Sequence, residues 1–257
     1  MYKERTTSMD PAFREEICRL LGADKFEQYG YVGDSSVLNN FSNNRYVEPK
    51  RLAGETTHDI RPMMWWVNPD IAVDPTVHGP IENGRTFCLV IHKDEFPAIE
   101  MGGSEISPVL RPNVNVVPGP GTDILHDLNN PFPMQSETYG FVYSRFTIEH
   151  IKNSRIKQFI SECYRITKPG GVNIHIAPNL KAQCDAMAKL DRWAHHDVQI
   201  IFAGTEDPQT PDPWEGYHHT GFSPELAIEL FQEAGFSEVI IWEYPRYFLE
   251  MVIEAWK

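Results

Sequence analysis

Three histidines are the side chains of this sequence best suited to moving a proton. His150 directly follows a glutamate, and His218 and His219 precede a Gly-Phe-Ser-Pro segment. A histidine can act as a base without tuning, because its ordinary pKa of about 6.5 lies near neutral pH. Each of the three has a plainer alternative, which is to cap a helix or to pack locally. We predict His150, His218 and His219 as candidate catalytic residues.

The residue spacing does not favour a metal site. A metal would recruit the pairs His195–His196 and His218–His219, and adjacent histidines lack the spacing that places two ligands on one face of a helix. The four cysteines are scattered and form no Cys-x-x-Cys pair, so we expect reduced, structural thiols. No metal is therefore predicted.

Composition limits the class of protein and its partners. The 257 residues are 41% hydrophobic and 23% charged, as in ordinary globular proteins. The formal net charge of −13 repels a polyphosphate, which disfavours nucleic acid as a partner. No run approaches the ~20 apolar residues of a membrane span, and the N-terminal residues lack the apolar core of a signal peptide. We expect a cytoplasmic protein with no nucleic-acid or membrane partner.

Periodicity and turn residues predict alternating strands and helices beyond residue 85. Apolar residues spaced three and four apart from Ile156 to Ile166 predict a helix that Pro169-Gly170-Gly171 ends. A second helix is expected to begin at Ser223-Pro224 and to end at Gly235. Strands are expected at residues 86–92, 98–101, 113–117, 141–144, 172–177, 238–242 and about 247–256. The last two strands are too close in sequence for a crossover helix, so they must pair antiparallel.

The first 96 residues carry weaker signals. An N-cap at Asp10, a proline at the next position and an apolar stripe predict a short helix that ends before Gly22. Residues 29–85 are rich in Asn, Pro, Gly and Ser and are expected to be irregular. Their apolar cluster at 63–67 is interpreted as core; if exposed, it would be a surface for homodimerisation or for ligand binding.

Four segments carry motifs in a compatible order. They are an acidic residue with a glycine loop, an Asp-Leu followed by Pro-Phe-Pro, a strand followed by a Glu-His pair, and an Arg-x-x-Lys-Pro-Gly-Gly run. Their sequences are IEMGGS at 99–104, HDLNNPFP at 126–133, YGFVYS at 139–144 with IEHI at 148–151, and RITKPGG at 165–171. Together they resemble the motif series of class I S-adenosylmethionine-dependent methyltransferases of the small-molecule branch. The segments FAG at 202–204, HHTGFSP at 218–224 and EAGF at 233–236 are similar to predicted methyltransferases found among bacterial sugar and surface-polymer genes.

The resemblance implies a fold, a cofactor and a reaction. The fold is α/β, a Rossmann-like, mostly parallel sheet with an antiparallel last strand over residues 97–257, and residues 1–96 form a cap over the acceptor or a dimerisation segment. The cofactor is S-adenosylmethionine, whose methyl group passes to an oxygen or nitrogen of a small molecule such as a sugar or a sugar-linked intermediate. The glycines then allow close approach of the cofactor to backbone N–H groups at a helix N-terminus. The cofactor-binding residues carried over from the motifs are Glu100, Gly102, Gly103, Asp127, Leu128, Ser144 and Arg145.

Three positions depart from the family pattern. Ser104 stands where the loop usually has a second glycine, Val117 where an acid usually binds the ribose hydroxyls, and Gly140 where aspartate is frequent. Loss of the ribose carboxylate removes roughly 1.5–3 kcal/mol of hydrogen bonding. Two alternatives therefore stay open. One is a non-catalytic scaffold with a degenerate cofactor loop, and the other is an enzyme that binds another nucleotide through the two loop glycines, although the G-x-G-x-x-G fingerprint is absent.

Overall fold

The chain divides into two compact units. The computed structural model describes residues 10–21, 29–33, 45–55, 63–67, 85–92, 96–106, 108–189, 218–244 and 250–257. One unit consists of Met1–Lys50 and Thr57–Phe96, and the other of Arg51–Thr56 and Pro97–Lys257. The histidine pair at 195–196 and the motif at 202–204 lie outside the described residues. The role of the first unit as a cap or a dimerisation segment stays a prediction.

The first unit contains a helix and an antiparallel sheet among its described residues. Helix α1 (Pro11–Leu21) begins as predicted, since Asp10 Oδ1 accepts the backbone N–H of Ala12 at 2.8 Å. The sheet has the order β1-β5-β4-β2, and each neighbouring pair is antiparallel. Its strands are β1 (Tyr29–Gly33), β2 (Arg45–Val47), β4 (Met63–Val67) and β5 (Arg85–His92). The prediction that residues 29–85 are irregular was therefore wrong, because backbone pairing forms strands here without a clear alternation of apolar and polar residues.

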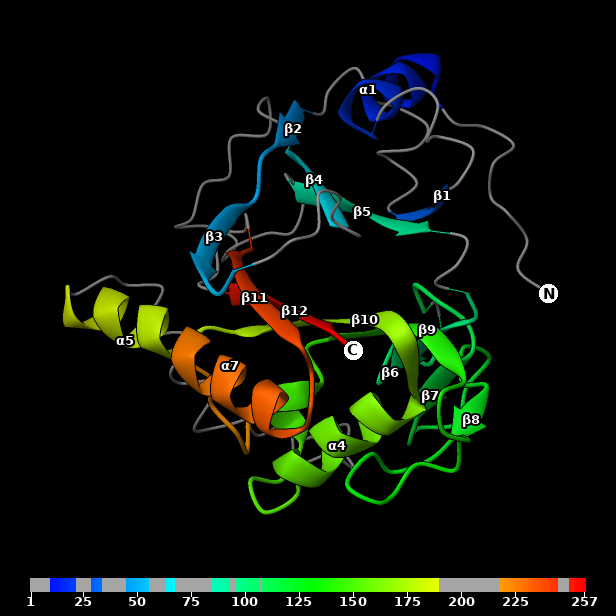
Figure 1. Ribbon diagram of the computed structural model, residues 1–257, viewed down its shortest axis with the longest axis vertical. Helices are drawn as coiled ribbons and strands as arrows, with labels where there is room; N and C mark the ends of the chain where they lie inside the picture. Colours follow the sequence, from blue (N-terminus) through cyan, green and yellow to red (C-terminus); the bar gives the residue numbers. More distant parts are fainter. Residues whose placement is uncertain are drawn as a thin grey trace, which may run out of the picture. The chain divides into compact units, whose positions relative to one another are not determined.

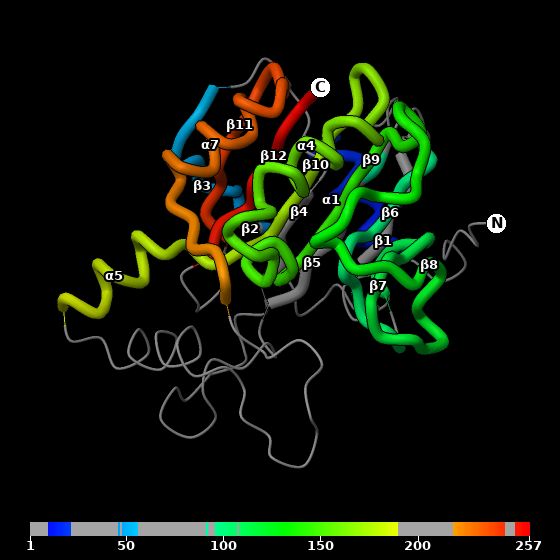
Figure 2. The backbone as a smooth tube through the Cα atoms, turned by 90° about the horizontal axis from the view of Figure 1, so that it is seen from below, coloured from blue at the N-terminus to red at the C-terminus, as the bar shows by residue number. Residues whose placement is uncertain are grey.

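Among the described residues of the second unit, eight strands form one sheet. Their order is β3-β11-β12-β10-β9-β6-β7-β8, and Figure 2 shows these strands from β3 at one edge of the sheet to β8 at the other. Strand β6 is parallel to β7 and β9, β8 is parallel to β7, and β10 is parallel to β9, whereas β12 is antiparallel to β10 and β11. The bounds are β3 (Lys50–Ala53), β6 (Ala98–Met101), β7 (Asn113–Asn115), β8 (Ile124–Leu125), β9 (Tyr139–Arg145), β10 (Thr167–Pro178), β11 (Glu238–Glu243) and β12 (Glu250–Trp256). The predicted α/β fold, a mostly parallel sheet with an antiparallel last strand, is confirmed.

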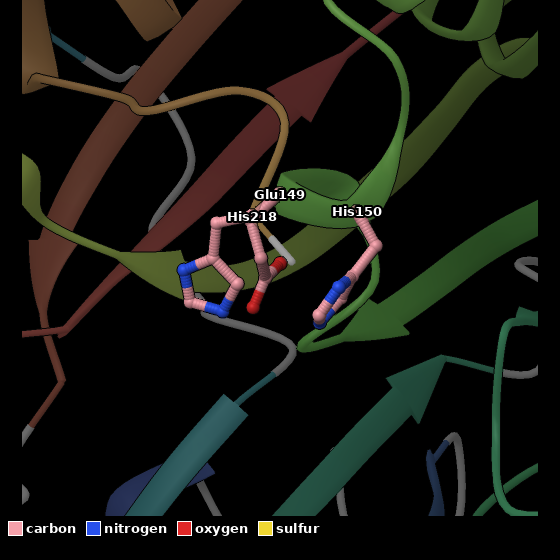
Figure 3. Close-up of side chains that lie close together, drawn as sticks. All are labelled: Glu149, His150 and His218. Atoms are coloured by element: carbon pink, nitrogen blue, oxygen red, sulfur yellow. The ribbon is translucent and has the colours of Figure 1, made fainter. Parts of the chain in front are cut away.

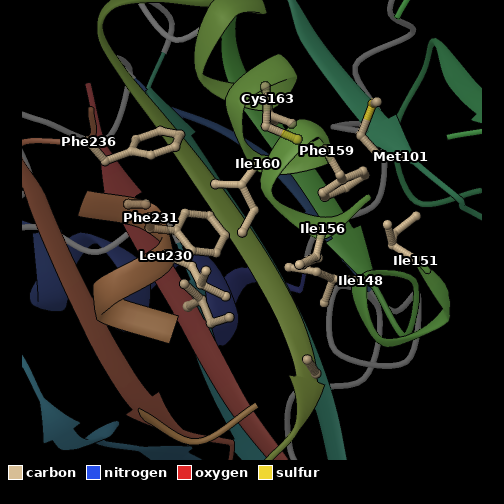
Figure 4. Packing of buried hydrophobic residues seen from close by; sticks show 14 of the residues in the cluster. Met101, Ile148, Ile151, Ile156, Phe159, Ile160, Cys163, Leu230, Phe231 and Phe236 are labelled. Atoms are coloured by element: carbon tan, nitrogen blue, oxygen red, sulfur yellow. The ribbon is translucent and has the colours of Figure 1, made fainter. Parts of the chain in front are cut away.

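Two helices of the second unit pack on the same face of this sheet (Figures 1 and 4). Helix α4 (Ile156–Ile166) buries all five apolar residues of its predicted stripe, and α7 (Pro224–Glu233) begins where Ser223 Oγ accepts the N–H of Leu226 at 3.2 Å. The other helices of the described residues are η6 (Ile148–His150), a 3-10 turn, and α5 (Leu180–Ala188). Within these described ranges, every helix is too short or too polar to cross a membrane.

The connection between β6 and β7 departs from the family pattern. The resemblance places a helix after the glycine loop, but residues 102–106 and 108–112 contain none, and β7 pairs parallel with β6 directly afterwards. This connection is about as short as a parallel crossover can be. The implied helix was therefore a wrong expectation, because the chain between the two strands is too short to hold one.

Arg165, the first residue of the Arg-x-x-Lys-Pro-Gly-Gly run, holds the Pro-Phe-Pro segment in place. Its guanidinium donates to the carbonyl oxygens of Phe132 at 3.1 Å and Met134 at 2.8 Å, and to the two carboxylate oxygens of Glu162 at 2.7 and 2.8 Å. Glu162 Oε2 in turn accepts the backbone N–H of Phe132 at 2.6 Å. The ring of Phe132 is buried against that of Phe159, a residue of α4. Arg165, Glu162 and Phe159 therefore hold the Pro-Phe-Pro segment against α4.

Arg165→Ala is expected to lower the free energy of unfolding by roughly 2 kcal/mol, because hydrogen bonds to a charged group contribute about 1.5–3 kcal/mol. Arg165→Lys should recover only part of this loss, since lysine lacks the planar donor fork. Urea unfolding measures both variants. The control is Arg155→Ala, which removes an exposed arginine beside the start of α4. An equal loss of unfolding free energy in Arg155→Ala and Arg165→Ala would contradict the role of Arg165 in holding the Pro-Phe-Pro segment.

Candidate active site

The predicted site residues gather where parallel strands end. Gly102 and Gly103 follow β6, Asp127 follows β8, and Arg145 is the last residue of β9. Ligands of open α/β sheets bind at this carboxyl edge. Motifs that are far apart in the chain therefore share one edge of the sheet.

A strained turn leads from β9 to η6. Phe146 has a φ of 52°, in the left-handed region that a bulky side chain rarely adopts. The next residue, Thr147, is buried, and its hydroxyl lies 3.3 Å from the carbonyl oxygen of Gly102 and 3.2 Å from that of Arg145. The turn thereby sets η6 beside the glycine loop.

Glu149 and His150 of η6 meet His218 (Figure 3). Each side chain offers a nitrogen or oxygen atom, and these atoms all lie within 4.8 Å of one another. The rings of His150 and His218 are edge to face, with centroids 4.9 Å apart and an angle of 85° between their planes. Figure 3 shows the carboxylate of Glu149 between the two rings. We call these three residues the Glu-His-His cluster.

Backbone hydrogen bonds hold the segment that carries His218 against η6. The N–H groups of His219 and Thr220 both donate to the carbonyl oxygen of Glu149, at 2.8 and 3.1 Å. The Thr220 hydroxyl also donates to the carbonyl oxygen of Ile151 at 2.9 Å. Of the three histidines predicted as catalytic, the structure brings two together, and the side chain of His219 is exposed outside the cluster. Glu149 was not predicted, and its only signal in the sequence is its place beside a candidate histidine.

Burial controls the charges of the cluster. Glu149 is 2% exposed, and burial raises its pKa from 4.5 to about 8, against a hydrogen bond from its own backbone and with a further increase from the charge of Glu250. Burial, followed by the charges of His150 and His219, lowers the pKa of His218 from 6.5 to about 4. His218 is therefore a neutral imidazole at neutral pH, with a nitrogen lone pair that can accept a proton or bind a cation.

The glycine loop packs on side chains of the protein itself. Gly102 has a φ of 72°, and a Cβ at this position would collide with the side chain of Thr147. A Cβ on Gly103 would collide with the carboxylate of Glu100. The N–H groups of both glycines donate to oxygen atoms of β7, at 2.7 and 2.9 Å. The close backbone approach that the resemblance implies is thus not offered by these two N–H groups.

Asn115 is the last residue of β7, two residues before Val117, the position that we align with the family's ribose-binding acid. Its Nδ2 donates to the carbonyl oxygen of Gly103 at 2.6 Å, and its Oδ1 accepts the N–H of Val117 at 2.9 Å. Val117 itself lies beyond the strand. The end of the second parallel strand therefore carries a neutral amide that is bound to the loop.

The other predicted cofactor residues divide into two groups. Asp127 and Arg145 place polar groups at the edge, where the Asp127 carboxylate accepts hydrogen bonds from the two asparagines of its own turn. The side chains of Leu128 and Ser144 are buried, the first in the apolar core and the second with its Oγ 2.7 Å from His175 Nδ1. These two side chains face the protein interior, so a contact to a cofactor from either residue would have to come from its backbone.

The side chain of Glu100 is buried and binds the backbone of the loop that precedes β7. Its Oε2 accepts the N–H of Leu110 at 2.6 Å. Burial raises the pKa of Glu100 from 4.5 to about 7, against hydrogen bonds from the backbone of Leu110 and Val109 and against the charge of Arg145. The carboxyl is therefore half protonated near neutral pH, in a position where it supports the loop.

Replacing this carboxyl should change how stability depends on pH. The folded protein holds a proton on Glu100 that the unfolded chain releases between about pH 4.5 and 7, so the contribution of this group to stability falls as pH rises across that window. The full effect is about 3 kcal/mol, at 1.36 kcal/mol per pKa unit. Glu100→Gln should flatten the pH dependence of the free energy of unfolding, measured in urea at both ends of the window. Glu105→Gln controls for the change in net charge, and equal slopes in the two variants would refute the assignment.

Several known proteins that resemble part of this chain are described as methyltransferases. Residues 103–175 match a family described as a methyltransferase domain. Similar solved structures include S-adenosylmethionine-dependent methyltransferases from Thermotoga maritima (16% identity, 62% of this chain and 81% of that chain, TM-score 0.41), Archaeoglobus fulgidus (13% identity, 62% and 85%, TM-score 0.42) and Mesorhizobium loti (9% identity, 62% and 90%, TM-score 0.40). These structural likenesses are too weak to carry an argument. A comparison with curated proteins finds no match.

The side chains at the edge fit the two ends of S-adenosylmethionine. The guanidinium of Arg145 is a suitable partner for the carboxylate of the amino-acid part, and Asp127 has lone pairs left for the amino group of adenine. Residues 103–175, which hold most of these edge residues, are thus the part of the chain that is similar to a methyltransferase domain, and the cofactor that this similarity implies is S-adenosylmethionine.

Proposed function

We propose that this protein transfers the methyl group of S-adenosylmethionine to an oxygen or nitrogen atom of a small molecule. The observation that carries the proposal is the Glu-His-His cluster, two of whose residues lie on η6, and η6 follows a turn bound to the glycine loop. In such a transfer the bond from sulfur to the methyl carbon breaks, the bond from the acceptor atom to that carbon forms, and the acceptor loses a proton. The neutral imidazole of His218 supplies a group that can take this proton.

The acceptor class follows from charge and from the motifs in the C-terminal third. A net charge of −13 disfavours a polyanionic acceptor. The segments at 218–224 and 233–236 are similar to methyltransferases associated with sugar and surface-polymer genes. Sugar hydroxyls are therefore the first acceptors to test, followed by phenols and amines.

The test separates cofactor binding from turnover. Isothermal titration with S-adenosylmethionine and with S-adenosylhomocysteine should show binding to the wild type and weaker binding to Asp127→Ala. Turnover is followed as release of S-adenosylhomocysteine in the presence of each acceptor. His218→Ala should lower kcat by about 10²–10⁴-fold, the usual contribution of proton transfer, while cofactor binding stays unchanged. His219→Ala, measured in parallel, shows whether the exposed neighbour contributes.

A failure of cofactor binding would overturn the proposal. If the folded wild type binds neither S-adenosylmethionine nor its product, the protein does not transfer methyl groups from this donor. If it binds both and His218→Ala turns over as fast as the wild type, the edge is the cofactor site but the cluster is not part of the reaction.

A further inference from the structure

We propose that Glu149, His150 and His218 bind a divalent transition-metal ion. Two imidazoles and one carboxylate form the donor set of catalytic zinc sites, in which a further coordination position stays open for water or substrate. Ligand atoms bound to one tetrahedral zinc ion at about 2.0–2.2 Å lie roughly 3.3–3.6 Å apart. The donor atoms of the cluster already lie within 4.8 Å of one another, so the three side chains need to move together by about an ångström to share an ion.

The buried carboxylate gives independent support for a cation. Glu149 is 2% exposed, and its Oε2 has no hydrogen-bond partner among the residues that the structure describes. A polar oxygen atom without a partner is unfavourable in the protein interior, and proteins normally give such an atom a hydrogen bond or use it to coordinate a metal. A second buried carboxylate, that of Glu250, interacts electrostatically with Glu149 and adds to the negative potential. Local packing explains two adjacent histidine rings, but it leaves this oxygen atom without a role.

The backbone holds the three ligands in place without an ion. The left-handed turn at Phe146 directs η6, and two N–H groups of the segment 218–220 bind the carbonyl oxygen of Glu149. The Thr220 hydroxyl fixes the same segment to Ile151. The segments that carry His150 and His218 are thereby joined by hydrogen bonds of neighbouring residues, which do not use the metal-binding atoms. A prearranged site of this kind binds an ion without the entropy loss of ordering its ligands.

The sequence-based expectation of no metal considered only pairs of adjacent histidines. The cluster instead combines one residue of such a pair with a Glu-His pair from another motif. The binding of the ion does not depend on the proposed methyl transfer. The role of the ion in the reaction does rest on that proposed function. The open position would take the acceptor oxygen, and metal binding makes a hydroxyl lose its proton to water more readily. His150 and His218 would then be metal ligands rather than bases.

Metal binding can be measured without the methyl donor. The full chain is treated with a chelator, dialysed and titrated with Zn²⁺ by isothermal calorimetry, and Co²⁺ is used in parallel to record visible d–d absorption. The wild type should bind one ion per chain, and Zn²⁺ should raise its melting temperature. Glu149→Gln and His218→Ala should each weaken binding by more than about tenfold, the loss that even an outer partner of a metal site causes. His219→Ala, which removes the exposed neighbour, should bind as the wild type does.

Several results would overturn the metal site. These are no binding of Zn²⁺ or Co²⁺ by the folded wild type, unchanged affinity in both ligand variants, or an equal loss in His219→Ala. Circular dichroism checks the fold, and His150→Gln, at a half-buried position, repeats the test if Glu149→Gln does not fold. Chelation separates the two proposals. Metal binding without turnover counts against the methyl transfer alone, whereas turnover that survives complete chelation counts against the metal alone.

Discussion

Gly102→Val is expected to abolish binding of S-adenosylmethionine and to lower the free energy of unfolding by roughly 2–5 kcal/mol. The φ of 72° at Gly102 is a left-handed conformation that costs a residue with a Cβ about 1–2 kcal/mol. The missing Cβ also leaves room for the buried side chain of Thr147. A valine at this position bears the cost of the left-handed conformation and also has to displace the side chain of Thr147, the residue before η6. Isothermal titration and urea unfolding measure the two effects.

The chain offers a matched control at another glycine. Gly170 has a φ of 75°, but a Cβ there would have no atom within 4 Å. Gly102→Ala and Gly170→Ala therefore share the conformational penalty, and only the first collides with Thr147. Equal destabilisation of the two alanine variants would mean that the contact between the loop and Thr147 has no energetic weight. Full cofactor affinity in Gly102→Val would show that the loop is not part of the cofactor site.

Glu254→Leu is expected to lower the free energy of unfolding by roughly 2–6 kcal/mol, because it leaves two buried indole N–H groups without an acceptor at about 1–3 kcal/mol each. Glu254 is 2% exposed in β12. One of its carboxylate oxygens accepts Nε1 of Trp242 at 2.6 Å, and the other accepts Nε1 of Trp256 at 2.8 Å. The carboxylate thus joins β11 to β12 on one face of the sheet. Urea unfolding, followed by tryptophan fluorescence, measures the loss.

Glu254→Gln separates loss of charge from loss of both acceptors. Glutamine keeps a single acceptor oxygen, which can serve one indole, while its amide nitrogen faces the other donor. Its stability should therefore lie between those of the wild type and Glu254→Leu. A loss below about 1 kcal/mol in Glu254→Leu would contradict the assignment, since apolar packing would then replace the hydrogen bonds without penalty.

Much of the second unit could be predicted from local patterns. Helix α4 occupies the residues expected from its spacing of apolar side chains, and α7 begins at the expected Ser-Pro cap. The antiparallel pairing of β11 with β12 followed from the few residues between them. Strand β5 of the first unit was predicted at residues 86–92, but β1, β2 and β4 were missed, because each pairs with a distant segment, as β1 at 29–33 does with β5 at 85–92. Such pairing leaves little signal in the short strands themselves.

The residue pattern alone determined α4, α7 and the antiparallel pairing of the last two strands, because helical spacing, caps and connection lengths act over a few residues. His150 and His218 were also predicted from the sequence as residues for proton chemistry, and this role stays a prediction. Only the tertiary structure decided that these two histidines lie close to Glu149 and that Ser144 faces the interior. It also decided that the side chains of Glu100 and Thr147 pack against the glycine loop. The reason is physical. Contacts between distant segments and the burial that shifts a pKa arise when the chain closes on itself, and no local spacing records them.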